Sequence, residues 1–280
     1  MTGALARATT ALFVPGNRPE RFPKASQSGA DVVIVDLEDA VAAGDKDRAR
    51  EAVIASINQG LRAAIRINGL LQGGERDLRA IAQLDPRSRG NLEGVVLPKA
   101  EEAQEVELVA TVVTGAPVMA LVESAAGLAA SATLAASPAV VRLGFGALDF
   151  GADVGSADRT VLDHARASLV ITSRATRIAP PIDSPTPEFQ HAETVRREAL
   201  RSRTLGFGGQ LCIHPSQVEI VAKAFLPTDD ELAWARRVMA TQARGVAVVD
   251  GAMVDRPVLL RAEAILRRYA AGSSAGRLDG

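Results

Sequence analysis

VVIVDLEDAV (residues 32–41) joins a strand-like run to a cluster of acids. Four β-branched residues come first, and Asp36, Glu38 and Asp39 follow within the next four positions. A continuous β-branched run predicts a strand that is buried on both faces, as in a parallel sheet. Carboxylates at the end of such a strand need a partner, because a buried charge is costly unless it is paired or binds a metal. The stretch therefore predicts a parallel α/β fold with a charged site at the carboxyl end of a strand.

Strand-like and helix-like stretches alternate along the rest of the chain. Short β-rich runs lie at 11–16, 31–36, 63–68, 94–99, 117–124, 140–146, 178–183 and 209–215. Stretches rich in Ala, Leu, Arg and Glu lie at 45–59, 75–84, 100–113, 159–175 and 187–203. This alternation predicts an α/β fold of the (β/α)₈, or TIM, barrel type, for which about 250 residues are typical. A doubly wound open sheet is the alternative, but neither a G-x-G-x-x-G nor a G-x-x-x-x-G-K-[ST] motif follows the first strand.

The chain continues beyond the eighth strand-like run. We expect residues 1–230 to form the barrel and residues 231–280 to form a C-terminal extension. Within the extension, residues 231–243 predict a helix, and a hairpin with an Asp-Gly turn and a second helix follow. The hairpin and the second helix carry more apolar residues than a solvated extension needs. We therefore expect this part to pack on a neighbouring subunit as well as on its own barrel.

Composition narrows the class of protein. The 280 residues carry a net charge of −1 and are 47% hydrophobic but only 3% aromatic. The sequence offers neither the basic patch nor the stacking aromatics that nucleic-acid binding calls for. No apolar run is long enough to cross a membrane, and the N-terminus has no clear signal-peptide pattern, so we expect a soluble cytoplasmic protein. The single cysteine, Cys212, excludes an intrachain disulfide, and its apolar surroundings predict a buried thiol.

The ends of the predicted strands carry the candidate site residues. Barrel enzymes have their active sites at the carboxyl ends of the strands. Besides the acids of the opening stretch, these ends carry Arg66, Lys99, Glu123 and Asp149. Glu123 and Asp149 follow apolar runs, where a carboxylate should be paired or bind a metal. Carboxylates without a Cys or His cluster favour Mg²⁺ or Mn²⁺ over Zn²⁺. Arg66 can clamp a carboxylate through two N–H groups.

Each of these residues also has a purely structural interpretation. Arg66 fits a salt bridge at the barrel rim, Glu123 a charge at a helix N-terminus, and Asp149 a helix cap. The acids of the opening stretch could pair with Lys46 or Arg48. Position alone leaves both interpretations open for any single residue. Their joint occurrence at strand ends favours a shared site.

Seven stretches of the chain occur together and in order in one enzyme family. They are LFVPGNRPERFPKASQSGADVVIVDLEDAV, IRIN, VVLPKAE, ALVESAAGL, LGFGALDFGADVG, GFGGQLCIHPSQV and GAMVDRPVLLRA. With them the sequence resembles the HpcH/HpaI aldolase and citrate lyase β-subunit family, particularly its stand-alone CitE-like and malyl-CoA lyase-like members. The resemblance covers nearly the whole chain. It implies a TIM-barrel aldolase or lyase that uses Mg²⁺ and often acts on acyl-CoA thioesters.

The resemblance also implies roles for the candidate residues. Glu123 and Asp149 match metal ligands, with Glu123 also facing the substrate, and Arg66 matches the catalytic arginine that holds the keto-acid part of the substrate. The acids of the opening stretch match a cluster beside the metal that organises bound waters and the arginine. Asp255, in MVDRP, matches a catalytic aspartate that acts from a neighbouring subunit, which implies a homotrimer or a hexamer.

The chain departs from the family pattern at two positions. The family commonly has an acid directly before the metal-binding aspartate, where this chain has Leu148. A lysine is usual where this chain has Gln210. If that lysine holds the CoA phosphates, this chain lacks one positive contact with CoA.

The activity that the resemblance implies is reversible cleavage of a β-hydroxyacyl-CoA, of the malyl-, citramalyl- or citryl-CoA type, into an acyl-CoA and a 2-keto acid. Two alternatives stay open: an acyl-CoA thioester hydrolase on the same metal site, and a non-catalytic subunit of a citrate-lyase-like complex. Lys99 provides a mechanistic alternative, because a desolvated lysine could form a Schiff base with a carbonyl substrate. The acyl chain and the keto acid do not follow from the sequence.

Overall fold

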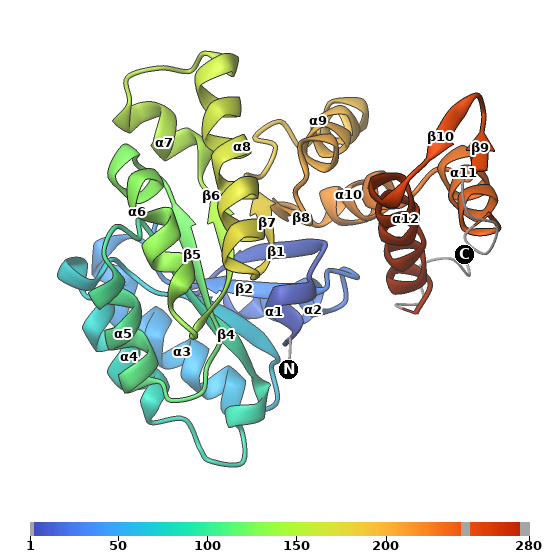
Figure 1. The fold of residues 1–280 in the computed structure, drawn as a ribbon. Helices are drawn as coiled ribbons and strands as arrows, with labels where there is room; N and C mark the ends of the chain where they lie inside the picture. Colours follow the sequence, from blue (N-terminus) through green and yellow to red (C-terminus); the bar gives the residue numbers. More distant parts are fainter. Residues whose placement is uncertain (1–2, 242–246, 275–280) are drawn as a thin grey trace. The chain divides into compact units, whose positions relative to one another are not determined.

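Eight parallel strands close into a barrel in the computed structural model of the chain, which describes residues 3–241 and 247–274 (Figure 1). Each strand pairs with the next one along the sequence, and β8 closes the ring on β1. The strands are β1 Thr10–Pro15, β2 Val32–Asp36, β3 Ala63–Arg66, β4 Leu92–Leu97, β5 Val118–Val122, β6 Val140–Phe145, β7 Ala179–Asp183 and β8 Gly209–Cys212. The predicted (β/α)₈ barrel is confirmed, and the open sheet is excluded.

Helices connect the strands and surround the barrel (Figure 1). They are α1 Ala4–Arg7, α2 Phe22–Ser26, α3 Lys46–Asn58, α4 Gly74–Ala82, α5 Ala103–Val112, α6 Ala125–Ala136, α7 Ala147–Asp153, α8 Arg159–Thr176, α9 Ala192–Leu205 and α10 Pro215–Phe225. Short 3₁₀ helices lie at Pro19–Arg21, Ala43–Asp45, Leu70–Gln72 and Arg89–Asn91. The helix expected over 187–203 begins only at Ala192. Residues just before it, Pro187 and Glu188, instead line a cavity at the barrel mouth.

Apolar side chains fill the barrel interior. The buried cluster there consists of Leu5, Ala8, Ala11, Val32, Ile34, Ala64, Val96, Met119, Leu121, Ile182 and Leu211. Leu5 lies on α1, so this short helix packs against the barrel core. Arg142 of β6 is 1% exposed. Its Nε donates to the carbonyl of Pro180 at 2.7 Å and its Nη1 to the carbonyl of Ala8 at 2.5 Å. These carbonyls satisfy a guanidinium that burial would otherwise make costly.

Residues 223–280 form a second compact unit, which divides from the first within α10 and before the expected boundary at 230. Its elements are α11 Asp229–Met239, β9 Ala247–Val249, β10 Ala252–Val254 and α12 Arg256–Ser274. The strands β9 and β10 are antiparallel. Asp250 and Gly251 join them with φ values of 52° and 79°, as a type I′ hairpin turn requires, and this confirms the predicted hairpin.

A small apolar core of its own holds the second unit together. It consists of Leu232, Ala235, Val238, Val254, Ala262 and Ile265. The helix expected over 231–243 ends at Met239, and residues 242 and 243 lie outside the described residues. None of the helices described in either unit is long and apolar enough to cross a membrane.

Candidate active site

The carboxyl ends of the strands open into a cavity of about 1160 Å³. Five of the residues predicted from strand ends line it: Asp36, Asp39, Arg66, Glu123 and Asp149. They come from four different strands or from the turns directly after them. The structure thus brings together residues that are spread over more than a hundred positions of the chain.

Arg66 and Asp36 form the centre of the charged side of the cavity. They are register partners on the neighbouring strands β2 and β3. Arg66 Nε donates to Asp36 Oδ1 at 2.7 Å and Arg66 Nη2 donates to Asp36 Oδ2 at 2.6 Å, a bidentate pair. Asp36 also accepts the backbone N–H groups of Glu38 and Ala40, so the turn after β2 is built around its carboxylate. The guanidinium lies 4.7 Å from the ring centroid of Phe13, a cation–π contact.

Glu38 lies between the two cations of this cluster. Its Oε1 accepts a 2.5 Å hydrogen bond from Lys99 Nζ, and its Oε2 lies 3.0 Å from Arg66 Nη1. Among the described residues, Oε2 has no hydrogen-bond partner, so the contact with Arg66 is an ion pair alone. Lys46 Nζ donates to the backbone carbonyls of Leu37 and Glu38. The alternative in which the acids of the opening stretch pair with Lys46 or Arg48 is therefore wrong, because Lys46 binds backbone oxygens and Arg48 pairs with Asp45.

Glu123 directly follows β5, and it is 5% exposed. Its Oε2 accepts a 2.9 Å hydrogen bond from the backbone N–H of Lys99, which has a positive φ of 47°. Gly146 leaves the space for the carboxylate, since a Cβ at that position would lie 2.4 Å from Glu123 Oε1. Burial, together with the negative charges of Glu38 and Asp149, raises the pKa of Glu123 to about 7.

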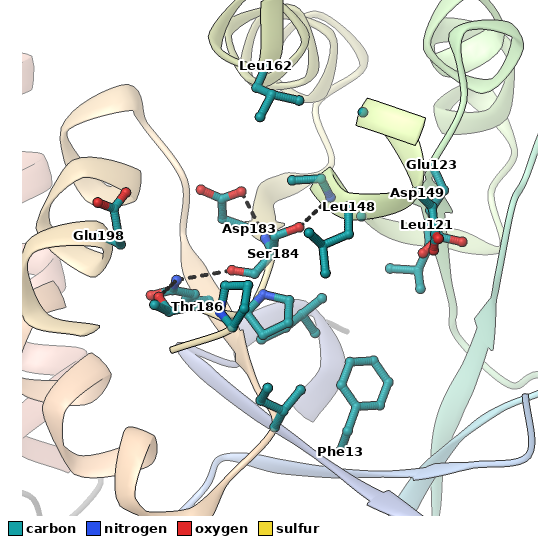
Figure 2. A pocket seen from close by; sticks show the side chains of 18 of the residues that line it. Phe13, Leu121, Glu123, Leu148, Asp149, Leu162, Asp183, Ser184, Thr186 and Glu198 are labelled. Atoms are coloured by element: carbon teal, nitrogen blue, oxygen red, sulfur yellow. Dashed lines mark hydrogen bonds between the residues drawn. The ribbon is translucent and has the colours of Figure 1, made fainter. Parts of the chain in front are cut away.

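Asp149 lies in the first turn of α7 and is half-buried. Within the described part of the chain, its carboxylate has no hydrogen-bond or ion-pair partner, and α7 has no side-chain cap. The alternative in which Asp149 caps a helix is therefore wrong. Both Glu123 and Asp149 line the cavity, and Figure 2 draws their carboxylates on the same side of it.

The donor set on this side of the cavity suits a divalent cation. Five carboxylates, those of Asp36, Glu38, Asp39, Glu123 and Asp149, stand near three cations, those of Lys46, Arg66 and Lys99. Burial, followed by the negative charge of Glu38, is the main reason why Glu123 holds its proton. The described residues contain no group of three or more Asp, Glu, His or Cys that could hold a metal. Mg²⁺ needs no such group, because it usually binds through one or two carboxylates and keeps several waters.

Lys99 does not resemble a Schiff-base lysine. Burial acts against its ammonium, but the hydrogen bond and the charge of Glu38, with Asp39 and Glu123, outweigh burial and raise the pKa of Lys99. A Schiff-base lysine needs a lowered pKa, because the neutral amine is the nucleophile. The charges around Lys99 favour the protonated ammonium instead.

The far side of the cavity contains charged residues that the sequence reasoning missed. Asp183, the last residue of β7, accepts two 3.0 Å hydrogen bonds from Arg166 Nε of α8 and one from Ser202 of α9. Arg201 of α9 is ion-paired with Asp163 of α8. A signal for Asp183 was present in the sequence, since the residue ends the seventh predicted strand.

Gln210 lies inside the barrel mouth and is 3% exposed. Its Nε2 donates to the carbonyl of Ser184 at 3.0 Å and lies 3.1 Å from the hydroxyl of Thr186, so it holds the segment after β7. This position lines the cavity and does not face the outer surface. The nearby Cys212 is buried, as predicted, and burial raises the pKa of its thiol to about 12.

Asp255 belongs to the second unit, whereas the other candidate residues belong to the first. Its Oδ1 accepts a 3.1 Å hydrogen bond from the backbone N–H of Val258 at the start of α12. In its own chain, Asp255 therefore acts as a helix cap.

Known proteins of one enzyme family are similar to this chain over most of its length. The family model described as HpcH/HpaI aldolase/citrate lyase matches residues 9–215. A citrate lyase subunit beta-like protein from Mycobacterium tuberculosis is 39% identical and the match spans 94% of this chain and 96% of that protein. An L-malyl-CoA/beta-methylmalyl-CoA lyase from Rhodobacter capsulatus is 33% identical, over 92% of this chain and 93% of that protein. A (3S)-malyl-CoA thioesterase from Cereibacter sphaeroides is 32% identical, over 91% and 94%. The crystal structure of CitE from M. tuberculosis with magnesium, acetoacetate and coenzyme A has a TM-score of 0.82 and 36% identity, and the match covers 95% of this chain and 99% of that one.

Proposed function

Because the chain belongs to the HpcH/HpaI aldolase/citrate lyase family, we propose that it is a Mg²⁺-dependent carbon–carbon lyase. Its substrate is a β-hydroxyacyl-CoA of the malyl-, citramalyl- or citryl-CoA type, which it cleaves reversibly into an acyl-CoA and a 2-keto acid. The observation that carries the proposal is the pair of carboxylates, Glu123 and Asp149, on the wall of a large cavity with a surplus of negative charge. Support also comes from the related L-malyl-CoA/beta-methylmalyl-CoA lyase.

Glu123 and Asp149 are the proposed metal ligands, with Mn²⁺ as the alternative metal. When bound there, the ion supplies Lewis-acid polarisation of the keto oxygen. The charge of the ion also favours the ionised form of Glu123, which burial alone disfavours. Support for this assignment comes from the related CitE structure that contains magnesium.

Arg66 is the proposed binding group for the carboxylate of the keto acid. A guanidinium has five N–H donors, and Asp36 uses one on Nε and one on Nη2. Within the described residues, Nη1 has ion pairs but no hydrogen bond, so the end of the fork remains available to a ligand. The contacts with Asp36 fix the plane of the guanidinium before the substrate arrives, which lowers the entropy cost of binding.

The proposed condensation forms one carbon–carbon bond between the acyl-CoA and the keto acid. A base removes a proton from the α-carbon of the acyl-CoA, the enolate carbon forms a bond to the keto carbon, and the keto π electrons move onto oxygen. Arg66 stabilises the alkoxide, which then takes up a proton. Cleavage is the reverse of these steps. We assign the proton transfer to Asp255 of a neighbouring subunit in a homotrimer or a hexamer.

A thioester hydrolase is the second candidate, and the related (3S)-malyl-CoA thioesterase favours it. One assay separates the two activities. The protein is incubated with Mg²⁺ and malyl-, citramalyl- or citryl-CoA, and both the keto acid and the free CoA thiol are measured. We expect keto acid together with intact acyl-CoA. Free thiol with an intact hydroxy acid would indicate the hydrolase instead, and neither product would indicate a non-catalytic subunit.

A further inference from the structure

Apolar side chains surround the two carboxylates of the proposed metal site. Leu121 of β5 lies two residues before Glu123, and both line the cavity. Leu148 directly precedes Asp149 at the start of α7. Phe13 lines the same cavity, and Figure 2 draws it with Leu121 and Leu148 around the open space.

Leu148 is the most unusual of these residues, because 71% of it is exposed although it lines the cavity. Solvent-exposed leucines are common singly and need no explanation on an outer surface. Leu148, however, directly precedes Asp149, which is a proposed metal ligand. It lines the cavity, so a molecule bound there would cover it. The wall thus offers an uncovered apolar surface beside the charged corner.

The cations of the cavity all have carboxylate partners. The described residues that line it include Arg66, Arg166 and Arg201 but neither lysine nor histidine. Arg166 is bound through Nε to both oxygens of Asp183, and Arg201 is ion-paired with Asp163. Lys99 also lies on the side of the proposed metal site, but it is not among the residues that line the cavity and its ammonium is hydrogen-bonded to Glu38. Arg66 is the lining cation on that side, and a single substrate carboxylate occupies its remaining donors. A second carboxylate on the keto acid therefore meets no unpaired cation there.

From these two observations we infer that the site selects 2-keto acids with an apolar substituent over those with a second carboxylate, and that Leu148 is the residue that determines this specificity. The inference rests on the proposed function and narrows its substrate class. The keto acid has the form R–CO–COO⁻, and its one carboxylate binds Arg66. The group R then packs against Leu148 and Leu121. A charged R would lose its hydration against leucine side chains without a compensating ion pair.

A pair of keto acids of equal size tests this inference. Oxaloacetate and 4-methyl-2-oxopentanoate carry substituents with the same number of heavy atoms and differ in charge. We expect 4-methyl-2-oxopentanoate and pyruvate each to bind at least tenfold more tightly than freshly prepared oxaloacetate in the presence of Mg²⁺, measured by calorimetry. The same order is expected for kcat/KM in condensation with acetyl-CoA, followed by chromatography of the hydroxyacyl-CoA product. Equal or tighter binding of oxaloacetate would overturn the inference.

Substitution of Leu148 tests the role of this residue. Leu148→Arg supplies a cation to the wall, and we expect it to raise the affinity for oxaloacetate relative to 4-methyl-2-oxopentanoate at least tenfold. Leu148→Met keeps an apolar wall of similar volume and should keep the wild-type preference. Leu71→Arg is the matched control, because Leu71 is 97% exposed and lies outside the cavity. A wild-type preference in Leu148→Arg would remove Leu148 as the determinant.

The binding measurement separates this inference from the proposed function. If no keto acid condenses with acetyl-CoA but the binding order is as expected, the lyase activity is wrong and the specificity stands. If condensation occurs fastest with oxaloacetate, the lyase activity stands and the specificity is wrong.

Discussion

The backbone N–H of Lys99 donates a 2.9 Å hydrogen bond to the carboxylate of Glu123, while the side chain of the same lysine donates to Glu38. Lys99, which follows β4, therefore connects the buried carboxylate of Glu123 after β5 with that of Glu38 after β2. Its left-handed backbone, with φ at 47°, directs the N–H toward the cavity. Such a conformation is uncommon for a residue with a Cβ and persists where the surrounding contacts hold it. The proposed metal ligand is thus held in place before a metal binds.

Removal of either proposed ligand charge should abolish metal binding. Glu123→Gln and Asp149→Asn keep the size of the side chain and remove the negative charge that attracts Mg²⁺. We expect each variant to bind Mg²⁺ at least tenfold more weakly in calorimetry and to lose turnover. Glu107→Gln is the control, because Glu107 is an exposed residue of α5 outside the cavity. Unchanged Mg²⁺ affinity in both cavity variants would show that the metal site is misassigned.

The raised pKa of Glu123 predicts the pH dependence of stability without metal. Burial raises the pKa from 4.5 to about 7, so the folded protein holds this proton more tightly than the unfolded chain. The resulting stability is fully present below pH 4.5 and is lost as the pH rises through 7. The loss should be about 3 kcal/mol at most in the free energy of unfolding. Urea titrations at pH 5.5 and 8 should show this fall in the wild type and a smaller one in Glu123→Gln. Saturating Mg²⁺ should restore the stability that the wild type loses between pH 5.5 and 8. An equal loss of unfolding free energy in the wild type and in Glu123→Gln would contradict the burial effect.

Gly146→Ala should disturb the site without unfolding the barrel. The added Cβ would lie 2.4 Å from Glu123 Oε1, so the carboxylate must move. We expect weaker Mg²⁺ binding with a melting temperature close to that of the wild type. Gly44→Ala serves as the control, because a Cβ at position 44 meets nothing within 4 Å. Wild-type Mg²⁺ affinity in Gly146→Ala would mean that the orientation of Glu123 does not matter for the metal.

Arg66→Lys should lose catalysis although it keeps the charge. An ammonium cannot bind both oxygens of Asp36 and also present a fork to the keto acid. We expect kcat/KM to fall by a factor that corresponds to roughly 2 kcal/mol, with Mg²⁺ affinity changed much less. Arg62→Lys is the matched control, since Arg62 lies just before the same strand and forms an exposed ion pair with Glu93. Wild-type kinetics in Arg66→Lys would rule out the clamp.

The assignment of Asp255 to a neighbouring site predicts complementation between inactive subunits. Asp255→Asn keeps the oxygen that caps α12 but cannot carry a proton. We expect Asp255→Asn and Glu123→Gln to be nearly inactive alone and to regain part of the activity when refolded together. Native mass spectrometry confirms that the subunits have mixed. Mixed oligomers without recovered activity, or an active monomer in sedimentation, would show that Asp255 acts only as a cap.

The sequence was sufficient to predict the barrel, because buried parallel strands have a simple signature. Runs such as Val32–Asp36 are apolar on both faces, and Pro, Gly or Asp marks their ends. Helix α6 was not among the predicted stretches, since its buried face consists largely of small residues such as Gly127, Ser131 and Ala135. An Ala-rich helix of this kind has little polar–apolar periodicity.

The composition of the charged cluster could be predicted from the strand ends, but its pairing could not. Arg66 meets Asp36 because β2 and β3 pair in a particular register, and a sequence pattern does not give that register. The hydrogen bond from the Lys99 backbone to Glu123 depends on a left-handed residue that is neither Gly nor Asn. The ion pair of Asp183 with Arg166 requires α8 to lie beside β7, which is a property of the closed barrel.

The contact between Arg142 and Ala8 spans 134 residues, and it bears on the order in which the chain folds. During synthesis β1 emerges first, yet one of its two neighbours, β8, is complete only when residues 209–212 have left the ribosome. Until then β1 presents an open edge, and until β6 has emerged α1 also lacks the guanidinium that holds its carboxyl end. Contacts so distant in sequence form late, because the entropy of closing the intervening loop is lost before they can compensate for it. The nascent barrel therefore passes through an open stage with an unpaired strand, and this stage is where aggregation competes with closure.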